Sequence, residues 1–286
     1  MRPLDSCLLG GPKIPNLGQL VDLLAPNVTR ISFDRNCLLT DVSTNQEDDE
    51  TMFIPCNVVP FKEAGVIQEV VFKFNVKDDP TWLQRTWGEV HFLTQLPPHP
   101  NLLPLDRIVL DDGDVEPRLL GFTARYLPGG NFENTRKLFR LEWLHQLLDV
   151  VDFLNLELGV MHQDIAPRNL LVDDKTNKLI LFDFDCAAVG EHNGKFYENR
   201  HDVKGVKNFS PTPYVQERFD MIMGKADWPP CWPSCWPLDA DVSRFRAVLN
   251  EWVAKRTSDM EADKKRYHEA AKRRGFKLPA RPKAPD

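Results

Sequence analysis

The sequence predicts an α+β protein whose N-terminal part is rich in strands and whose C-terminal part is mainly helical. Apolar and polar residues alternate between 66 and 76, which is typical of a strand with one buried face. Apolar residues recur every three or four positions between 138 and 158, as in a buried helix. Short apolar runs at 170–172 and 178–182 flank turn residues at 173–177 and predict a hairpin.

Composition and charge narrow the function classes. The chain has 286 residues, 42% of them hydrophobic and 27% charged, which indicates a soluble globular protein with room for a sizeable core. A net charge of −6 argues against a general nucleic-acid binder. Because no apolar run approaches a membrane span and residues 1–16 lack a long apolar core, we expect an intracellular protein, cytoplasmic or nuclear, with no membrane partner.

The N-terminal part holds one short helix and several strands. Apolar spacing from Leu17 to Leu24 predicts a short amphipathic helix. The expected strands are Cys37 to Val42, Met52 to Val59 and Val66 to Val76. In the last strand, Lys73 projects from the face opposite the phenylalanines on either side of it.

A helix and a further strand follow. Asp79 is a good N-cap, Pro80 suits the first helical position, and the Pro-Pro pair at 97–98 ends the helix. Glu89 is its only acidic residue after the first turn. Residues 118–131 are predicted to form a strand that ends in a Gly-Gly turn.

Two more helices are expected in the C-terminal part. The helix from Leu138 to Leu158 is capped by Gly159, and we expect it to be a buried scaffold that positions the loop at 162–169, with no direct role of its own. A second amphipathic helix runs from Asp239 to Arg256, with five residues facing inward: Val242, Phe245, Val248, Leu249 and Trp252. From Lys255 onward the tail holds eleven Lys or Arg against five Asp or Glu, so we expect a solvated, charged helix there, with nuclear targeting as the alternative.

Chemistry concentrates between 160 and 188. Asp164 and Asp183 lie at the ends of two neighbouring strands, and Asn169 closes the loop after the first of them. Such a hairpin brings a carboxylate base close to two oxygen ligands for a hard cation. This set of groups suits phosphoryl transfer, in which the protein mainly positions reactants and neutralises charge.

The same residues carry a resemblance to a known family. His162-Gln163-Asp164, with Asn169, resembles the protein-kinase catalytic loop, and Asp183-Phe184-Asp185 resembles its metal-binding motif. The resemblance implies a two-lobed protein-kinase-like fold with a small β-rich N-terminal lobe and a larger, mainly helical C-terminal lobe. The implied divisions are an extension at 1–29, a kinase-like domain at 30–256 (N-lobe 30–124, hinge at about 125–131, C-lobe 132–256) and a basic tail at 257–286.

The resemblance also implies roles for single residues. Asp164 would act as the base, and Asn169 and Asp183 would hold the Mg²⁺ ions that bridge the phosphates of ATP. Lys73 would contact the α- and β-phosphates and pair with Glu89. The adenine ring would meet the hinge, which is formed by three consecutive residues, Arg125, Tyr126 and Leu127.

Several departures from the family pattern affect the prediction. The candidate phosphate loop, Ser43 to Thr51, contains no glycine and four acidic residues, which would repel a triphosphate. The alternative hairpin is Phe33 to Asn36, in which Arg35 would partly substitute for the glycines. Arg168 matches the arginine of tyrosine-directed members, and we expect it to stabilise charge on the transferred phosphoryl group. Asp185 stands where the family has glycine. Together with the catalytic-loop motif at 162–169, this Asp-Phe-Asp sequence also resembles that of small-molecule kinases of the aminoglycoside and choline type.

The segment between Asp183 and Asp202 is short for the activation segment of a protein kinase. Asp202 resembles the aspartate that braces the catalytic loop in that family. The string Asp-Val-Lys-Gly at 202–205 resembles a group of fungal kinase-like proteins. The segment 228–237 repeats Trp-Pro and is expected to be a packed loop or a partner surface.

Three functions therefore remain open. The first is ATP- and Mg²⁺-dependent transfer to a hydroxyl, with a protein Ser, Thr or Tyr as the expected acceptor. The second is a catalytically weak or inactive pseudokinase that works as a binding or scaffold module. The third is phosphorylation of a small molecule.

Overall fold

The computed structural model describes residues 29–32, 56–63, 66–74, 80–111, 118–132, 137–189, 202–209, 237–258 and 260–275. The described residues fall into two compact units. The first holds most residues up to Tyr126, and the second holds residues 98–102 and those from Leu127 onward. Among the described helices, none combines the length and apolar character that a membrane crossing requires.

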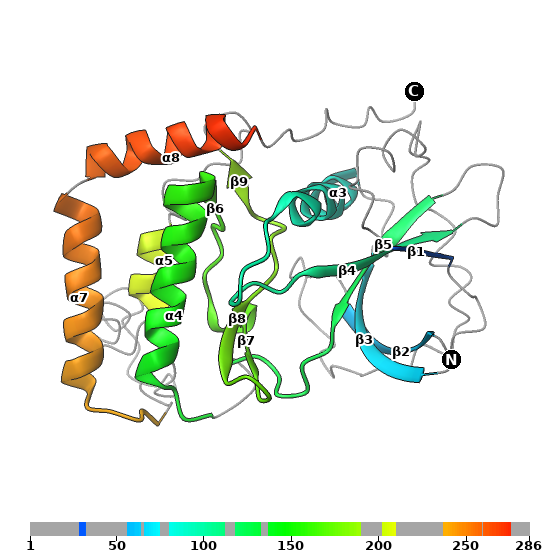
Figure 1. Cartoon of the computed structure of the whole chain (residues 1–286), viewed down its shortest axis with the longest axis horizontal. Coiled ribbons are helices and arrows are strands. Elements are labelled where there is room, and N and C mark those ends of the chain that lie inside the picture. The colour runs from blue at the N-terminus through cyan, green and yellow to red at the C-terminus, as the bar shows by residue number, and fades with distance from the viewer. Residues whose placement is uncertain are drawn as a thin grey trace, which may run out of the picture. The chain divides into compact units, whose positions relative to one another are not determined.

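The first unit is built on a five-stranded sheet with the order β1-β4-β5-β3-β2. Its strands are β1 (Thr29–Ser32), β2 (Cys56–Glu63), β3 (Val66–Phe74), β4 (Leu105–Asp111) and β5 (Arg118–Arg125). β1 pairs with β4 in parallel, and the other pairs are antiparallel. The helix α3 (Pro80–Gln95) packs against β4 and β5, as Figure 1 shows. Val70, Phe72 and Phe122 are buried in this sheet.

Comparison with the predicted elements gives a mixed outcome in this unit. The strand from Val66, the strand from Arg118 and the helix starting at Pro80 are confirmed. Of the strand predicted at 52–59, residues 56–59 are confirmed and belong to a strand that continues to Glu63, whereas residues 52–55 lie outside the described residues. β4 was not predicted, because Asp106 and Arg107 interrupt its apolar pattern. The predicted helix at 17–24, the strand at 37–42 and the loop at 43–51 lie outside the described residues.

The second unit is organised around α4 (Leu141–Asp152), which continues as the π-helix η1 (Phe153–Leu158). The predicted start at Leu138 is wrong. Residues 138–140 are extended, with the Phe139 N–H donating to the Pro237 carbonyl at 2.8 Å. The helix begins at Leu141 because its N–H is capped by the carboxylate of Asp239, 2.8 Å away. Its end is as predicted, since Gly159 adopts the left-handed conformation at φ 69°.

Short strands and three further helices complete this unit. The strands β6 (Val160–Met161) and β9 (Ala188–Val189) pair with each other, and so do β7 (Leu170–Asp173) and β8 (Lys178–Leu181). The helices are α5 (Asp202–Phe209), α7 (Val242–Ser258) and α8 (Met260–Arg274). Figure 1 shows α7 beside α4 and α8 across their ends.

The core of the second unit is aromatic where α4 meets α7. Phe132, Phe139 and Trp143 form edge-to-face pairs, and Phe245 of α7 joins them with ring centroids 6.1 Å from Phe139. Of the inward-facing residues predicted for this helix, three are buried: Phe245, Leu249 and Trp252. Val242 is 39% exposed, so its predicted inward position is wrong. It is the first residue of α7 and lies ahead of the packed turns.

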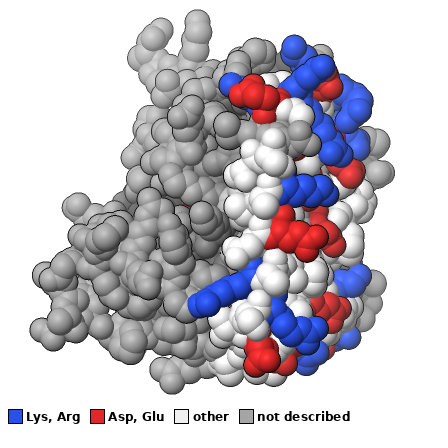
Figure 2. Space-filling view, turned by 90° about the vertical axis from the view of Figure 1, so that its left-hand side faces the viewer, with Lys and Arg blue, Asp and Glu red and all other residues white. Residues whose placement is uncertain are grey.

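The surface around α7 carries both signs of charge. Figure 2 shows Lys and Arg side chains interspersed with Asp and Glu on the described surface of this side. Along α8 the side chains of Lys264, Lys265 and Lys272 are exposed, while Tyr267 and Ala270 are buried. This pattern is that of a solvated, charged helix packed along one stripe.

Candidate active site

The catalytic-loop motif lies between β6 and β7 and is fixed at both ends. β6 pairs with β9, and Pro167 starts the 3-10 turn η2 (Pro167–Asn169) at a position that suits proline. The N–H of Asn169 donates to the Ala166 carbonyl at 2.9 Å and closes the turn. Asp164 therefore lies half-buried on a short loop whose ends are held by backbone hydrogen bonds.

Two side chains of this loop hold the carboxylate of Asp164. Nη2 of Arg168 donates to Oδ1 at 2.5 Å, and Nδ2 of Asn169 donates to Oδ2 at 2.7 Å. Nδ2 of Asn169 also donates to the backbone carbonyl of Asp164 at 2.8 Å. Because the amide nitrogen of Asn169 is occupied in this way, its Oδ1 is the side-chain atom suited to bind a cation. The three predicted catalytic residues thus form one contact group.

Asp183 follows β8 directly and has φ of 68°, in the left-handed region that is uncommon for residues with a side chain. Its neighbours on both sides are anchored. Phe182 donates from its N–H to the Asn169 carbonyl at 3.2 Å, and its own carbonyl lies 2.9 Å from Nε2 of His162. Phe184 is buried, with its ring centroid 4.7 Å from that of His162. An unusual backbone angle held by such anchoring is typical of functional positions.

The donor atoms of these residues fit a Mg²⁺ ion that is shared with a nucleotide. Mg²⁺ in such sites takes one or two carboxylates together with phosphate oxygens and waters. Asp183 supplies a carboxylate and Asn169 an amide oxygen. Among the described residues, no group of three or more His, Cys, Asp or Glu side chains gathers as in an all-protein metal cage. Asn169 and Asp183 offer two oxygen donors of the kind that Mg²⁺ takes.

Asp202, at the start of α5, holds the backbone of the catalytic loop, as the sequence predicts. It is fully buried, and its carboxylate accepts the N–H of His162 at 2.8 Å and that of Gln163 at 2.7 Å. α5 can come this close because Gly205 faces Ile165, where an added Cβ would stand 3.1 Å from the Ile165 Cβ. The bonds hold Gln163 at φ of 64°, another left-handed position.

Asn155 is a residue of this site that sequence reasoning missed. It lies in η1, within the helix that was assigned a scaffold role, and its hydrogen bonds show how this helix supports the catalytic loop. Its Nδ2 donates to Oδ2 of Asp202 and to the Val160 carbonyl, both at 2.8 Å. The available signal was a single polar residue between Leu154 and Leu156 in a buried apolar stretch.

Gln163 also ties the loop to the segment that follows Phe184. Its Nε2 donates to the carbonyl of Cys186 at 2.9 Å, and the side chain is buried. The bond is made by a neutral amide, so it needs no charged partner on the other segment.

In the first unit, Lys73 of β3 and Glu89 of α3 form a buried ion pair. Nζ of Lys73 lies 2.6 Å from Oε2 of Glu89, and the two side chains are 10% and 1% exposed. Nζ also lies 5.9 Å from the centroid of the Phe122 ring on the neighbouring strand. The pair predicted from the sequence is therefore present, and Glu89 orients the lysine.

The predicted hinge residues lie at the end of β5 and directly after it. Arg125 ends that strand and is exposed, Tyr126 is half-buried, and Leu127 is buried. The N–H of Gly130 donates to the Leu127 carbonyl at 3.4 Å and forms the predicted turn, with Gly130 at φ of 66°. Contact of these three residues with an adenine ring stays a prediction.

Comparisons with known proteins agree with this geometry. Residues 77–191 match the model of the Phosphotransferase enzyme family. The chain is 30% identical to casein kinase II subunit alpha' of Saccharomyces cerevisiae over 122 residues, which are 42% of this chain and 35% of that protein. It is 31% identical over 106 residues to CBL-interacting protein kinase 11 of Oryza sativa subsp. japonica, covering 35% of this chain and 20% of that protein.

These similarities confirm the resemblance to the protein-kinase-like family that the motifs indicate. The matched stretch contains the catalytic loop, the Asp183 motif and Glu89. The chain spans about a third or less of the length of the curated relatives it matches.

Proposed function

We propose that the protein is an ATP- and Mg²⁺-dependent phosphotransferase that transfers the γ-phosphate to a hydroxyl group, with a protein Ser, Thr or Tyr as the expected acceptor. The observation that supports this most is the contact group of the catalytic loop. Asn169 bonds twice to Asp164 through its amide nitrogen and keeps Oδ1 for a metal, next to the anchored strand end that carries Asp183.

In this proposal Asp164 orients the acceptor hydroxyl and takes its proton as the oxygen attacks the γ-phosphorus. The bond between the γ-phosphorus and the bridging oxygen of ADP breaks, and ADP leaves. Asn169 and Asp183 would hold Mg²⁺, which would neutralise charge on the phosphates. Lys73, oriented by Glu89, contacts the phosphates, and Arg168 stabilises charge on the transferred group once it is released from Asp164.

The hydrogen bonds to Asp164 also favour a second candidate, a pseudokinase that acts as a binding module. Both carboxylate oxygens are already engaged, by Arg168 and Asn169, so an acceptor hydroxyl has to share or displace one of these donors. The glycine-free loop predicted at 43–51 points the same way. A small-molecule acceptor is the third candidate, and activity on low-molecular-weight alcohols but not on proteins would establish it.

Thermal unfolding of the full chain with and without Mg²⁺ and ATP tests the proposal. A ligand present at about 100 times its dissociation constant stabilises the folded state by about 2.7 kcal/mol. We expect a stabilisation that requires Mg²⁺ and that Asp183→Asn abolishes. No stabilisation at millimolar ATP would favour the binding module, and phosphate transfer from labelled ATP would then be the deciding assay.

A further inference from the structure

Arg256, in the last turn of α7, joins three other helical elements from a buried position. Its side chain is 4% exposed. Nη1 donates to Asp152 at the end of α4 at 2.5 Å, Nε donates to Asp263 of α8, and Nη2 lies 3.2 Å from Oδ1 of Asn155 in η1. A guanidinium is rigid and planar, so a fork with partners on three elements fixes their relative positions.

The bond from Arg256 matters because it fixes the orientation of the Asn155 amide. Arg256 can only donate, so it requires the amide oxygen on its side. The Val160 carbonyl and the Asp202 carboxylate can only accept, so they require the amide nitrogen on theirs. Asn155 is fully buried, and its three hydrogen-bond partners all require the same orientation of the side-chain amide.

From Asn155 the hydrogen bonds continue to the catalytic loop. Asp202 receives Nδ2 of Asn155 on the same oxygen that accepts the His162 N–H, and its other oxygen accepts the Gln163 N–H. Gln163 immediately precedes Asp164. Three successive hydrogen-bonded contacts therefore connect Arg256 to the backbone just before Asp164, the proposed base. Arg256 lies 101 positions after Asn155 in the sequence.

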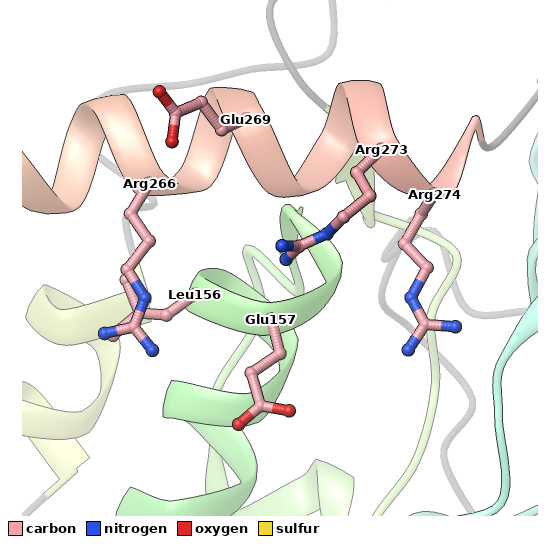
Figure 3. A pocket seen from close by; sticks show the side chains of 6 residues that line it. All are labelled: Leu156, Glu157, Arg266, Glu269, Arg273 and Arg274. Carbon is pink, nitrogen blue, oxygen red and sulfur yellow. The ribbon is translucent and has the colours of Figure 1, made fainter.

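α8 packs closely on η1, the element that carries Asn155. α8 touches the end of η1 closely, since a Cβ on Gly159 would lie 2.2 Å from the backbone N of Ala271. Next to this contact the two elements line a hollow of about 570 Å³. Figure 3 shows its lining, with Arg266 and Arg273 extending from α8 towards η1 while Glu269 points away.

The element that carries Asn155 has an unusual form. It is a π-helix, a form that occurs mostly as short insertions and often at functional sites. The side chains of Asp202 and Arg256 contact Asn155 in addition to the backbone bonds of this turn.

We propose that Arg256 is a positioning residue of the active site: it fixes the Asn155 amide, which holds Asp202 and, through it, the backbone that precedes Asp164. Its consequence for catalysis rests on the proposed phosphotransfer, but its effect on the loop does not. Arg256 itself touches neither nucleotide nor acceptor in this scheme. The competing view is that the arginine is a structural cross-link between helices and stabilises the whole unit evenly.

Amide hydrogen exchange in the full chain separates these two views without any need for activity. Arg256→Met removes the fork, and Leu249→Ala is the control, because Leu249 is buried in the same helix and makes no hydrogen bond to Asn155. After correction for global stability measured on the α4 amides, we expect the His162 and Gln163 amides to exchange about tenfold faster in Arg256→Met than in Leu249→Ala. Equal corrected rates in the two variants would overturn the proposal.

A double-mutant cycle tests whether the effect passes through Asn155. In an Asn155→Leu background, adding Arg256→Met should accelerate exchange at His162 and Gln163 no further. Effects that multiply would contradict the relay. If Arg256→Met does not fold, Arg256→Lys takes its place, because one ammonium cannot reach three acceptors and an intermediate rate is expected.

Measurement of kcat and KM is a further test, and this test depends on the proposed function. With an acceptor in hand, Arg256→Met should lower kcat with KM for ATP unchanged within twofold, and Arg256→Lys should restore part of the loss. A rise in KM alone would contradict a role at Asp164. A wild-type chain that neither binds ATP nor transfers phosphate would refute the proposed function, whereas the exchange result would still decide the role of Arg256.

Discussion

Nζ of Lys73 lies 2.6 Å from Oε2 of Glu89, and both side chains are almost completely removed from solvent. The two residues are 16 positions apart, on β3 and α3, so the pair fixes how the helix packs on the sheet. A buried pair of this kind is costly to break from one side, because the remaining charge is left without compensation. The ion pair therefore stabilises the packing of α3 on the sheet. In the proposed function it also orients Lys73 towards the phosphates of the nucleotide.

Replacing Lys73 tests both roles. Lys73→Met should lower the free energy of unfolding by about 3–5 kcal/mol, because Glu89 stays buried without its cation. Adding Glu89→Gln should recover part of that loss. Urea denaturation of the two variants measures these differences, and thermal unfolding with Mg²⁺ and ATP shows whether nucleotide stabilisation is also lost.

Lys137 offers a matched control, since it pairs with Asp174 at 2.8 Å on the exposed surface. Lys137→Met should change stability by no more than about 1 kcal/mol and leave the effect of nucleotide intact. If Lys73→Met keeps a full response to Mg²⁺ and ATP, the lysine is structural and the phosphate-clamp role fails.

Asp164 is expected to carry the proton-transfer step. Asp164→Asn keeps the size of the side chain but removes the base, so the rate of phosphate transfer should fall roughly 10²–10⁴-fold. The KM for ATP should change little, because the nucleotide is bound by other residues. Initial rates at saturating ATP measure the effect, and Asp174→Asn, at the exposed turn between β7 and β8, is the control. Wild-type activity in Asp164→Asn would remove this residue from the mechanism.

The parts of the site that the sequence predicts best are those set by local spacing. Asp164, Arg168 and Asn169 lie within six positions, so one tight turn at Pro167 brings them together whatever surrounds it. Glu89 was predictable for a related reason, since a helix places its single interior acid on one defined face. The match of Lys73 to Glu89 needed the family resemblance, because no local pattern relates a strand to a helix.

The parts that could not be predicted depend on distant partners. Helix α4 starts at Leu141 because Asp239 caps it, and Asp239 lies 98 positions away. β4 contains Asp106 and Arg107, which break an apolar pattern but bond to each other in the sheet. Asn155 resembles a stray polar residue until Asp202 and Arg256 are placed beside it.

Gly159 should be the most sensitive glycine among those described. Gly159→Ala forces a side chain into the left-handed region, at a cost of about 1–2 kcal/mol, and also into the backbone of Ala271. Gly275 is the control, because it has φ of 61° with no atom within 4 Å of an added Cβ. Gly275→Ala should therefore lose only the conformational part, and Gly159→Ala clearly more. Equal losses in urea denaturation would show that α8 moves aside without cost.

His99 should make stability depend on pH. Its ring stacks on Phe153 with centroids 4.5 Å apart, and its Nδ1 accepts the Asn101 N–H at 3.2 Å. Burial lowers the pKa of His99 below its ordinary value of 6.5 and outweighs Asp149 and Glu157, whose carboxylates act to raise it. The ring is therefore held neutral in the folded state at pH values where the unfolded chain already binds a proton.

The sign of the effect follows from proton binding. Between the lowered folded-state pKa and about 6.5 the unfolded chain carries more protons, so the contribution of His99 is complete above that range and is lost as the pH falls through it. His99→Asn keeps an acceptor for the Asn101 N–H but cannot titrate. Urea denaturation at half-unit steps between pH 7.5 and 5 should show wild-type stability falling more steeply than that of His99→Asn. Parallel curves would mean that His99 has the same pKa in the folded and unfolded states. Burial would then not favour the neutral imidazole.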